Sequence, residues 1–356
     1  MNDSRNLSMI EYFKRKGLSF EPRLRFKGTT KQDFVDWKKK LLSELKVALG
    51  PMSNPVPLNP KIICEIEAEG LIKQRVLLDT EADMSVVALV YIPKEALTTP
   101  APAILCNHGH GQYGKDSVMG VRSGNSPQRN IEIDRLNYDY GLQMAKRGYV
   151  TIAIDWRGFG ERGDYSETHD AHPYPGRDKC NIHFIRGSLM GINMLALNIF
   201  DGIRILDYLM SAAYVDASRI GAMGLSLGGT MTTWLSLLDE RIRVADIICY
   251  SARFKEFAIN RGNTCGSQFF PALYTICDLP DLHGLIAPRP LLAEIGMHDQ
   301  CFLIDEAMSC RDEVQKIYTA AGAASSYETE IFEGDHRFAG DKAFHFFDRH
   351  LKGIQK

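Results

Sequence analysis

The sequence predicts an α/β protein with a mostly parallel central sheet, helices on both faces and an antiparallel N-terminal edge. Two observations carry this prediction. Short apolar stretches such as 149–154 alternate along the chain with longer stretches of helical periodicity such as 195–210. Strands that are apolar throughout are typical of a parallel sheet covered on both faces. Before this alternation starts, three strand-like stretches follow one another at 62–67, 72–78 and 84–92, which predicts an antiparallel meander.

The remaining elements continue this alternation. Further strands are predicted at 103–106, 219–223, 244–250, 290–295 and 328–332, and further helices at 226–238, 305–320 and 341–351. Two long irregular stretches, at about 156–185 and 252–285, are interpreted as insertions. Residues 61–356 are therefore predicted to form one domain.

Residues 1–60 are predicted to be a helical extension and connector in front of this domain. Apolar residues repeat at helical spacing from Asp33 to Leu49, and Gly50-Pro51 ends the helix. Four prolines between residues 51 and 60 predict an extended connector. The helix is a candidate either for packing on its own domain or for contact between copies in a homo-oligomer.

The composition argues against several classes of partner. Lys and Arg total 42 and Asp and Glu total 44, a net charge of −2 without a long basic run, so neither nucleic acid nor an anionic membrane is an expected partner. The first residues lead into no apolar segment, so we expect no secretory signal. The longest apolar run, 84–92, is interrupted by Ser85 and is too short to span a bilayer. Eight cysteines lack CxxC spacing, which favours reduced thiols and a cytoplasmic protein.

The clearest chemical signal is a G-x-S-x-G pattern centred on Ser226. It follows the predicted strand 219–223 directly and opens an apolar helix. A tight strand–turn–helix places the serine in a strained backbone conformation, and glycines on either side remove the clashes. The hydroxyl then projects at the carboxyl end of the sheet, where the helix dipole favours developing negative charge. The alternative is a glycine-rich turn with an N-capping serine.

A serine nucleophile needs a base and an acid further along the chain. His336 follows the last predicted strand and precedes the last helix, which allows it to reach the carboxyl edge of the sheet. Asp299 comes just after the strand 290–295 and gives the order Ser, Asp, His. Asp335 is the rival acid, but a residue adjacent to His336 would point away from the ring in most loop conformations. Asp299 is therefore the preferred acid.

An oxyanion hole requires two preorganised N–H donors. The first candidate is the backbone of Leu227, directly after the serine, and the second is the backbone of His110 or Gly111 in the loop after the strand 103–106. The pair His108 and His110 has no carboxylate at ligand spacing, so no metal site is predicted there. A second group of potential ligands also fits no zinc pattern and is interpreted as an ordinary loop. Its members are His169, Asp170, His172, Asp178, Cys180 and His183.

With these motifs the chain resembles the α/β-hydrolase superfamily, and most of all its dienelactone-hydrolase and acetyl-xylan-esterase-like branch of bacterial serine esterases. The resemblance covers roughly residues 84–355. The motifs that carry it are His108-Gly109, Asp155-Trp-Arg-Gly-Phe-Gly160, Arg219-Ile-Gly, Gly224-Leu-Ser-Leu-Gly-Gly229, Ile286-Ala-Pro-Arg-Pro-Leu-Leu292 with Asp299, and Gly334-Asp-His336. Similar enzymes use the matching serine, aspartate and histidine as a triad, so the resemblance implies these roles for Ser226, Asp299 and His336, and implies no cofactor and no metal.

Two features depart from the pattern of these relatives. The carbohydrate-esterase branch typically shows Arg-Gly-Gln where this chain has Arg157-Gly158-Phe159, which weakens an assignment to sugar acetates. Dienelactone hydrolases are usually shorter and use a cysteine nucleophile, where this chain has Ser226.

The two insertions are expected to shape specificity. The first emerges at the same rim as Ser226, so Trp156, Arg157 and Phe159 are candidate substrate-binding residues. Arg157 has two interpretations, a structural partner of a carboxylate beneath the site or a ligand for an anionic substrate. The second insertion, 252–285, carries five aromatic residues and is either a cap over the acyl pocket or a packing surface for the N-terminal helix.

The function expected from these residues is serine-dependent hydrolysis of a small, acetyl-like carboxylic ester through an acyl-enzyme. A small-molecule ester is the expected partner. The alternatives are a peptidase or amidase of the same superfamily, or a binding protein that has kept the hydrolase fold without catalysis. Peptidases of this superfamily commonly carry a β-propeller domain, for which 356 residues leave no room.

Overall fold

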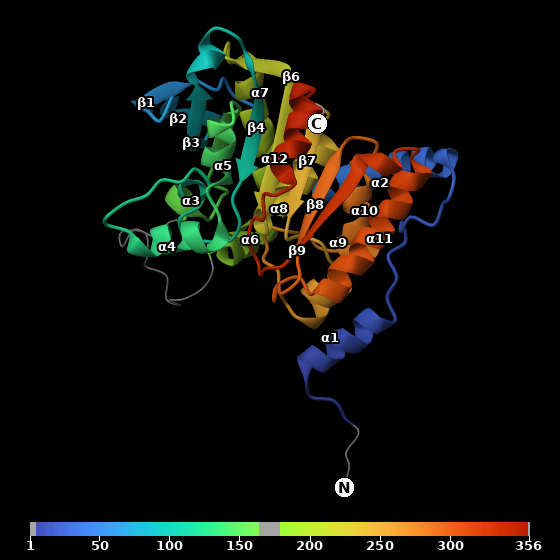
Figure 1. The fold of residues 1–356 in the computed structure, drawn as a ribbon. Coiled ribbons are helices and arrows are strands. Elements are labelled where there is room, and N and C mark those ends of the chain that lie inside the picture. Colours follow the sequence, from blue (N-terminus) through green and yellow to red (C-terminus); the bar gives the residue numbers. More distant parts are fainter. Residues whose placement is uncertain (1–4, 164–178, 355–356) are drawn as a thin grey trace.

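The structure is a computed structural model that describes residues 5–163 and 179–354. Its centre is a single nine-stranded sheet in the order β1-β2-β3-β5-β4-β6-β7-β8-β9, which crosses the molecule in Figure 1. The strands are β1 Lys61–Ala68, β2 Leu71–Glu81, β3 Met84–Pro93, β4 Ala101–Asn107, β5 Val150–Ile154, β6 Val215–Leu225, β7 Ile242–Ile248, β8 Leu291–Gly296 and β9 Tyr327–Phe332. β1, β2, β3 and β5 pair antiparallel in succession, and all pairs from β5 to β9 are parallel. The predicted sheet class, including its antiparallel edge, is confirmed.

Helices cover both faces of the sheet. The core on one face is shared by α2 Lys31–Leu49, α7 Met194–Ser211, α8 Leu227–Leu238, α10 Leu279–Gly284 and α11 Ile304–Ala320. The core on the other face is shared by α3 Lys115–Val118, α5 Tyr140–Lys146 and α12 Ala343–Phe347, which continues into the turn η6 Asp348–Lys352. The remaining helices of the described residues are α1 Met9–Leu18, α4 Pro127–Leu136, α6 Lys179–Leu189 and α9 Leu273–Ile276.

Strand β4 shows why these strands are apolar throughout. Successive side chains of a strand point to opposite faces. Ala103 and Leu105 therefore pack in the core beneath α7 and α8, whereas Ile104 and Cys106 pack in the core beneath α5 and α12. All four side chains are fully buried. Because both faces are covered, no polar position alternates with the apolar ones.

The N-terminal extension packs on its own domain through α2. A capping box between Thr30 and Asp33 starts this helix, and Leu41 and Leu45 are completely buried in the main core. Helix α1 lies against the turn η4 Lys255–Asn260 and projects from the body of the protein in Figure 1. Within the described residues no single helix is long and apolar enough to cross a membrane; α6 and α7 pass such a test only together, with a bend of 105° between them.

Candidate active site

Ser226 occupies a strained turn between β6 and α8. Its backbone has φ 61° and ψ −119°, a conformation that a residue with a side chain rarely adopts. Two hydrogen bonds fix this turn: the Ser226 N–H donates to Ile248 O at 2.9 Å, and Thr230 N–H donates to Ser226 O at 3.1 Å. A glycine is required at 228 because a Cβ there would lie 2.0 Å from Asn107 O of the neighbouring strand. The turn therefore presents the serine at the carboxyl end of the sheet.

His336 and Asp299 lie on the loops that follow β9 and β8. Nδ1 of His336 is 2.7 Å from Oδ2 of Asp299, whose side chain is almost completely buried. The other carboxylate oxygen, Oδ1, accepts the backbone N–H groups of Cys301 at 2.6 Å and Phe302 at 3.0 Å. The Phe302 ring stacks on the imidazole with centroids 5.8 Å apart. All these contacts hold the carboxylate and the ring in one orientation.

Asp335, the rival acid, points away from this pair. Its side chain is half exposed, with weak ion pairs to Arg135 at 3.7 Å and Arg337 at 3.9 Å. Of the two aspartates, it is therefore Asp299 that the structure brings to His336.

Ser226 and His336 face the same cavity, which has a volume of about 410 Å³. Its walls come from the loop after β4, from the segment around α4, from the second insertion and from the loops after β8 and β9. The described lining residues are Gly109, His110, Glu132, Arg135, Leu136, Tyr138, Leu225, Ser226, Gly262, Asn263, Thr264, Cys265, Gln268, Cys301, Phe302 and His336. One ligand bound in this cavity could therefore contact both Ser226 and His336.

Candidate oxyanion donors lie on both sides of Ser226. Leu227 is the first residue of α8, and the first N–H groups of a helix have no acceptor within that helix. Across from it, the Gly109 N–H donates to Tyr138 Oη at 2.6 Å, so that N–H is already used. Burial raises the pKa of Tyr138, which keeps its hydroxyl protonated. His110, the next residue, lines the cavity, whereas Gly111 is not among the described lining residues.

His108 is a structural residue beneath the site. Its Nε2 accepts the Trp156 N–H at 3.0 Å, so Nδ1 carries the proton and donates to Gly109 O at 2.7 Å. Burial lowers the pKa of His108 to about 4, which keeps the ring neutral. Both ring nitrogens are occupied, so His108 is not available to share a metal with His110.

The three candidate substrate-binding residues lie elsewhere than the sequence indicated. Trp156, Arg157 and Phe159 are buried and do not line the cavity. Arg157 makes a bidentate pair with Asp201, with both N···O distances 2.8 Å. Burial would raise the pKa of Asp201, but Arg162 and Arg157 outweigh it and hold that pKa below its ordinary value. The structural interpretation of Arg157 therefore replaces the substrate-binding one, because the side chains of these three residues, which follow β5, are buried in the protein interior.

The second insertion packs against the N-terminal extension and forms part of the cavity wall, and its role as a cap over the acyl pocket stays a prediction. Its turn η4 packs against α1, and Cys277 and Leu279 join the core shared with α2. Its residues Gly262, Asn263, Thr264, Cys265 and Gln268 line the cavity beside Ser226. From the first insertion, His169, Asp170, His172 and Asp178 lie outside the described residues.

The cavity wall formed by Glu132, Arg135 and Tyr138 was not predicted from the sequence. These residues lie in the long connection between β4 and β5, which beyond Gly111 carries neither a motif nor a clear periodicity. The hydroxyl of Tyr138 matters most, because it holds the loop that faces Ser226. Only the folded chain shows that this connection returns over the sheet edge.

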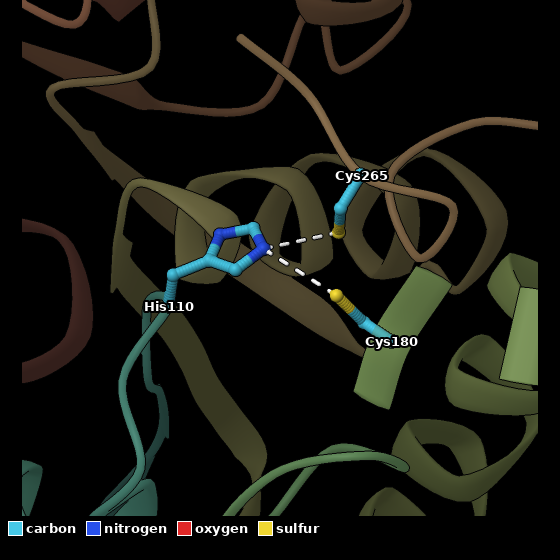
Figure 2. A group of neighbouring side chains, drawn as sticks. All are labelled: His110, Cys180 and Cys265. Atoms are coloured by element: carbon cyan, nitrogen blue, oxygen red, sulfur yellow. Dashed lines mark hydrogen bonds between the residues drawn. The ribbon is translucent and has the colours of Figure 1, made fainter. Parts of the chain in front are cut away.

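Two groups of side chains in the described residues have metal-ligating atoms within 4.8 Å of one another. One is Cys249 with Asp299 and His336, whose carboxylate and imidazole already bind each other. The other is His110 with Cys180 and Cys265, shown in Figure 2. Cys180 thus has a histidine and a second thiol as neighbours, which its sequence spacing did not predict.

A serine on a strained strand–helix turn, followed in the chain by an aspartate and a histidine on later loops of a mostly parallel sheet, defines the α/β hydrolases. The chain belongs to the Abhydrolase family, which matches residues 2–342.

Individual relatives agree with this membership. "Putative hydrolase YtaP" of Bacillus subtilis (strain 168) is 30% identical over 287 residues, which cover 78% of this chain and 87% of YtaP. A "putative acetyl xylan esterase" from Bacteroides fragilis NCTC 9343 has a TM-score of 0.73 at 20% identity, covering 94% of this chain and 84% of its own. A glucuronoyl esterase from Solibacter usitatus has a TM-score of 0.65 at 17% identity, and the match covers 94% of this chain and 98% of that esterase. These two structures share the fold.

Proposed function

We propose that the protein is a serine-dependent carboxylic ester hydrolase that works through an acyl-enzyme on small, acetyl-like esters. One observation carries the proposal: the strained Ser226 and the His336 imidazole, held by Asp299 at 2.7 Å, open into one cavity of about 410 Å³. The names of the structural neighbours, acetyl xylan esterase and glucuronoyl esterase, support an ester as the substrate.

The proposed roles follow from the hydrogen bonds. A carboxylate accepts the Nδ1–H of His336, which leaves Nε2 free to take the proton of Ser226 as the hydroxyl attacks the ester carbonyl. The N–H groups of Leu227 and His110 then hold the negative oxygen of the tetrahedral intermediate. His336 gives its proton to the leaving alcohol, and later takes one from the water that releases the acid.

The lining of the cavity supports a small acyl group. Among the described lining residues, Leu136, Leu225 and Phe302 alone carry large hydrocarbon side chains. A long acyl chain would find little apolar surface on such walls, and apolar contact supplies most of the binding energy for such chains. The polar groups of Asn263 and Gln268 suit a polar alcohol instead.

The test is hydrolysis of p-nitrophenyl acetate, butyrate and octanoate by the wild type, Ser226→Ala and the exposed control Ser218→Ala. We expect kcat/KM to fall steeply from acetate to octanoate, Ser226→Ala to lose at least about 10³-fold, and Ser218→Ala to match the wild type. A fluorophosphonate probe should label the wild type and not Ser226→Ala. Activity that survives in Ser226→Ala would overturn the serine mechanism, and activity that rises with chain length would overturn the small acyl group.

A further inference from the structure

The cluster of His110, Cys180 and Cys265 joins three segments that are far apart in the chain. His110 lies on the loop after β4, Cys180 in the first turn of α6, and Cys265 in the second insertion. Nε2 of His110 is 3.0 Å from the Cys265 sulfur and 3.9 Å from the Cys180 sulfur (Figure 2). The mechanism proposed above uses none of these three side chains.

We propose that this cluster is a binding site for one soft divalent cation, of which Zn²⁺ is the representative, held by two thiolates and one imidazole. Sulfur and imidazole nitrogen are the donors that such cations prefer, in contrast to the oxygen ligands of Mg²⁺ and Ca²⁺. Two thiolates also balance the charge of a divalent ion, so the loaded site is neutral. Neutrality matters here because both cysteines are buried.

The distances between the His110 nitrogen and the two cysteine sulfurs fit tetrahedral coordination of one ion after small rotations of the side chains. With Zn–S near 2.3 Å and Zn–N near 2.05 Å, tetrahedral geometry places sulfur and nitrogen about 3.6 Å apart and two sulfurs about 3.8 Å apart. The two N···S distances of 3.0 and 3.9 Å lie on either side of the first value. The three ligating atoms lie within 4.8 Å of one another. Rotation of the two cysteine side chains can therefore bring the sulfurs to the tetrahedral S···S distance of about 3.8 Å.

The surroundings favour a site with access from one side. The His110 ring packs edge-on against Phe159, with centroids 5.3 Å apart, which limits its rotation. The backbone of Cys265 is held by the amide of Gln268, whose Oε1 accepts the Cys265 N–H at 3.1 Å. His110 and Cys265 both line the cavity that contains Ser226, so an ion can enter from the cavity. Three protein ligands also leave a fourth position for water.

The consequence is a cross-link in the wall of the cavity. A bound ion would tie the loop that carries His110 to both insertions, and this loop includes the proposed oxyanion donor. The inference does not depend on the ester hydrolase activity, because the ligands are separate from Ser226, Asp299 and the His336 ring.

The experiment is titration of the full-length, reduced and chelator-treated protein with Co²⁺, whose absorption reports its ligands. We expect one equivalent to bind with intense tetrahedral d–d bands and sulfur-to-cobalt charge transfer in the near ultraviolet, and Zn²⁺ to displace it. Cys180→Ser and Cys265→Ser should each weaken binding by about 100-fold or more, because each removes a thiolate. Cys301→Ser, a thiol on the same cavity outside the cluster, should bind like the wild type.

Further measurements separate folding from binding. Circular dichroism and the melting temperature without metal should be the same for the serine variants and the wild type, and only the wild type and Cys301→Ser should melt at higher temperature with Zn²⁺. Ser226→Ala should bind Co²⁺ normally, whatever its activity. A weak octahedral spectrum that Cys180→Ser and Cys265→Ser leave unchanged would overturn the proposal. So would a Cys180–Cys265 disulfide that, once reduced, yields no saturable cobalt binding.

Discussion

The contact between His336 and Asp299 gives a sharp prediction for Asp299→Asn. In the wild type Oδ1 accepts two backbone N–H groups and Oδ2 accepts the Nδ1–H of His336. An asparagine will keep its oxygen toward the two N–H donors, because the opposite orientation would set its NH₂ group against both of them. The NH₂ group then faces Nδ1 and forces that atom to accept a hydrogen bond. The proton moves to Nε2, where it blocks the removal of the serine proton.

The expected loss in kcat is about 10⁴-fold, which is the effect of the same change in a measured triad and corresponds to about 5 kcal/mol of transition-state stabilisation. The fold should persist, since both backbone N–H groups keep their acceptor. The assay is p-nitrophenyl acetate hydrolysis at neutral pH, with the unfolding midpoint in urea as the check on folding.

Asp335→Asn is the matched control, because this rival carboxylate is exposed beside the same histidine. It should retain activity within a few-fold of the wild type. Asp299→Asn with more than a tenth of wild-type activity would refute the tautomer argument. A large loss in Asp335→Asn together with an active Asp299→Asn would show that the acid was assigned to the wrong residue.

Three further predictions concern the scaffold of the site. Gly109→Ala should lower kcat by about 10²-fold, because its Cβ would lie 2.8 Å from Leu225 O and push the oxyanion loop away; a wild-type kcat would contradict this. Arg157→Met should lower the free energy of unfolding in urea by up to about 3 kcal/mol, because Asp201 loses its bidentate partner and keeps only Arg162, whereas a change below about 1 kcal/mol would rule out a structural role. His108 has a pKa of about 4 when folded and an ordinary pKa near 6.5 when unfolded, so the unfolded chain binds more protons between these values. The free energy of unfolding should therefore fall as the pH drops from 6.5 to 4, by roughly 3 kcal/mol more in the wild type than in His108→Gln. If the free energies of unfolding of the two proteins depend on pH in the same way, His108 is not a buried neutral histidine.

Much of the fold could be predicted because its signals are local. Both faces of the sheet are covered, so strands such as 103–106 read as continuous apolar stretches, and the glycines around Ser226 mark the tight turn directly. Asp299 and His336 could be proposed because each comes directly after a predicted strand. Carboxyl ends of parallel strands meet at one sheet edge, which turns a position in the chain into a position in space.

What the sequence by itself determined is therefore the fold class, the serine turn and the strand ends that carry the aspartate and the histidine. Only the tertiary structure decided that Arg157 turns into the core toward Asp201, that Tyr138 holds the loop facing Ser226, and that His110 meets Cys180 and Cys265. Periodicity reports whether a residue is buried, but not against which distant segment it is buried. These contacts span between 29 and 155 residues of chain, so they depend on the path of the whole polypeptide rather than on any local pattern.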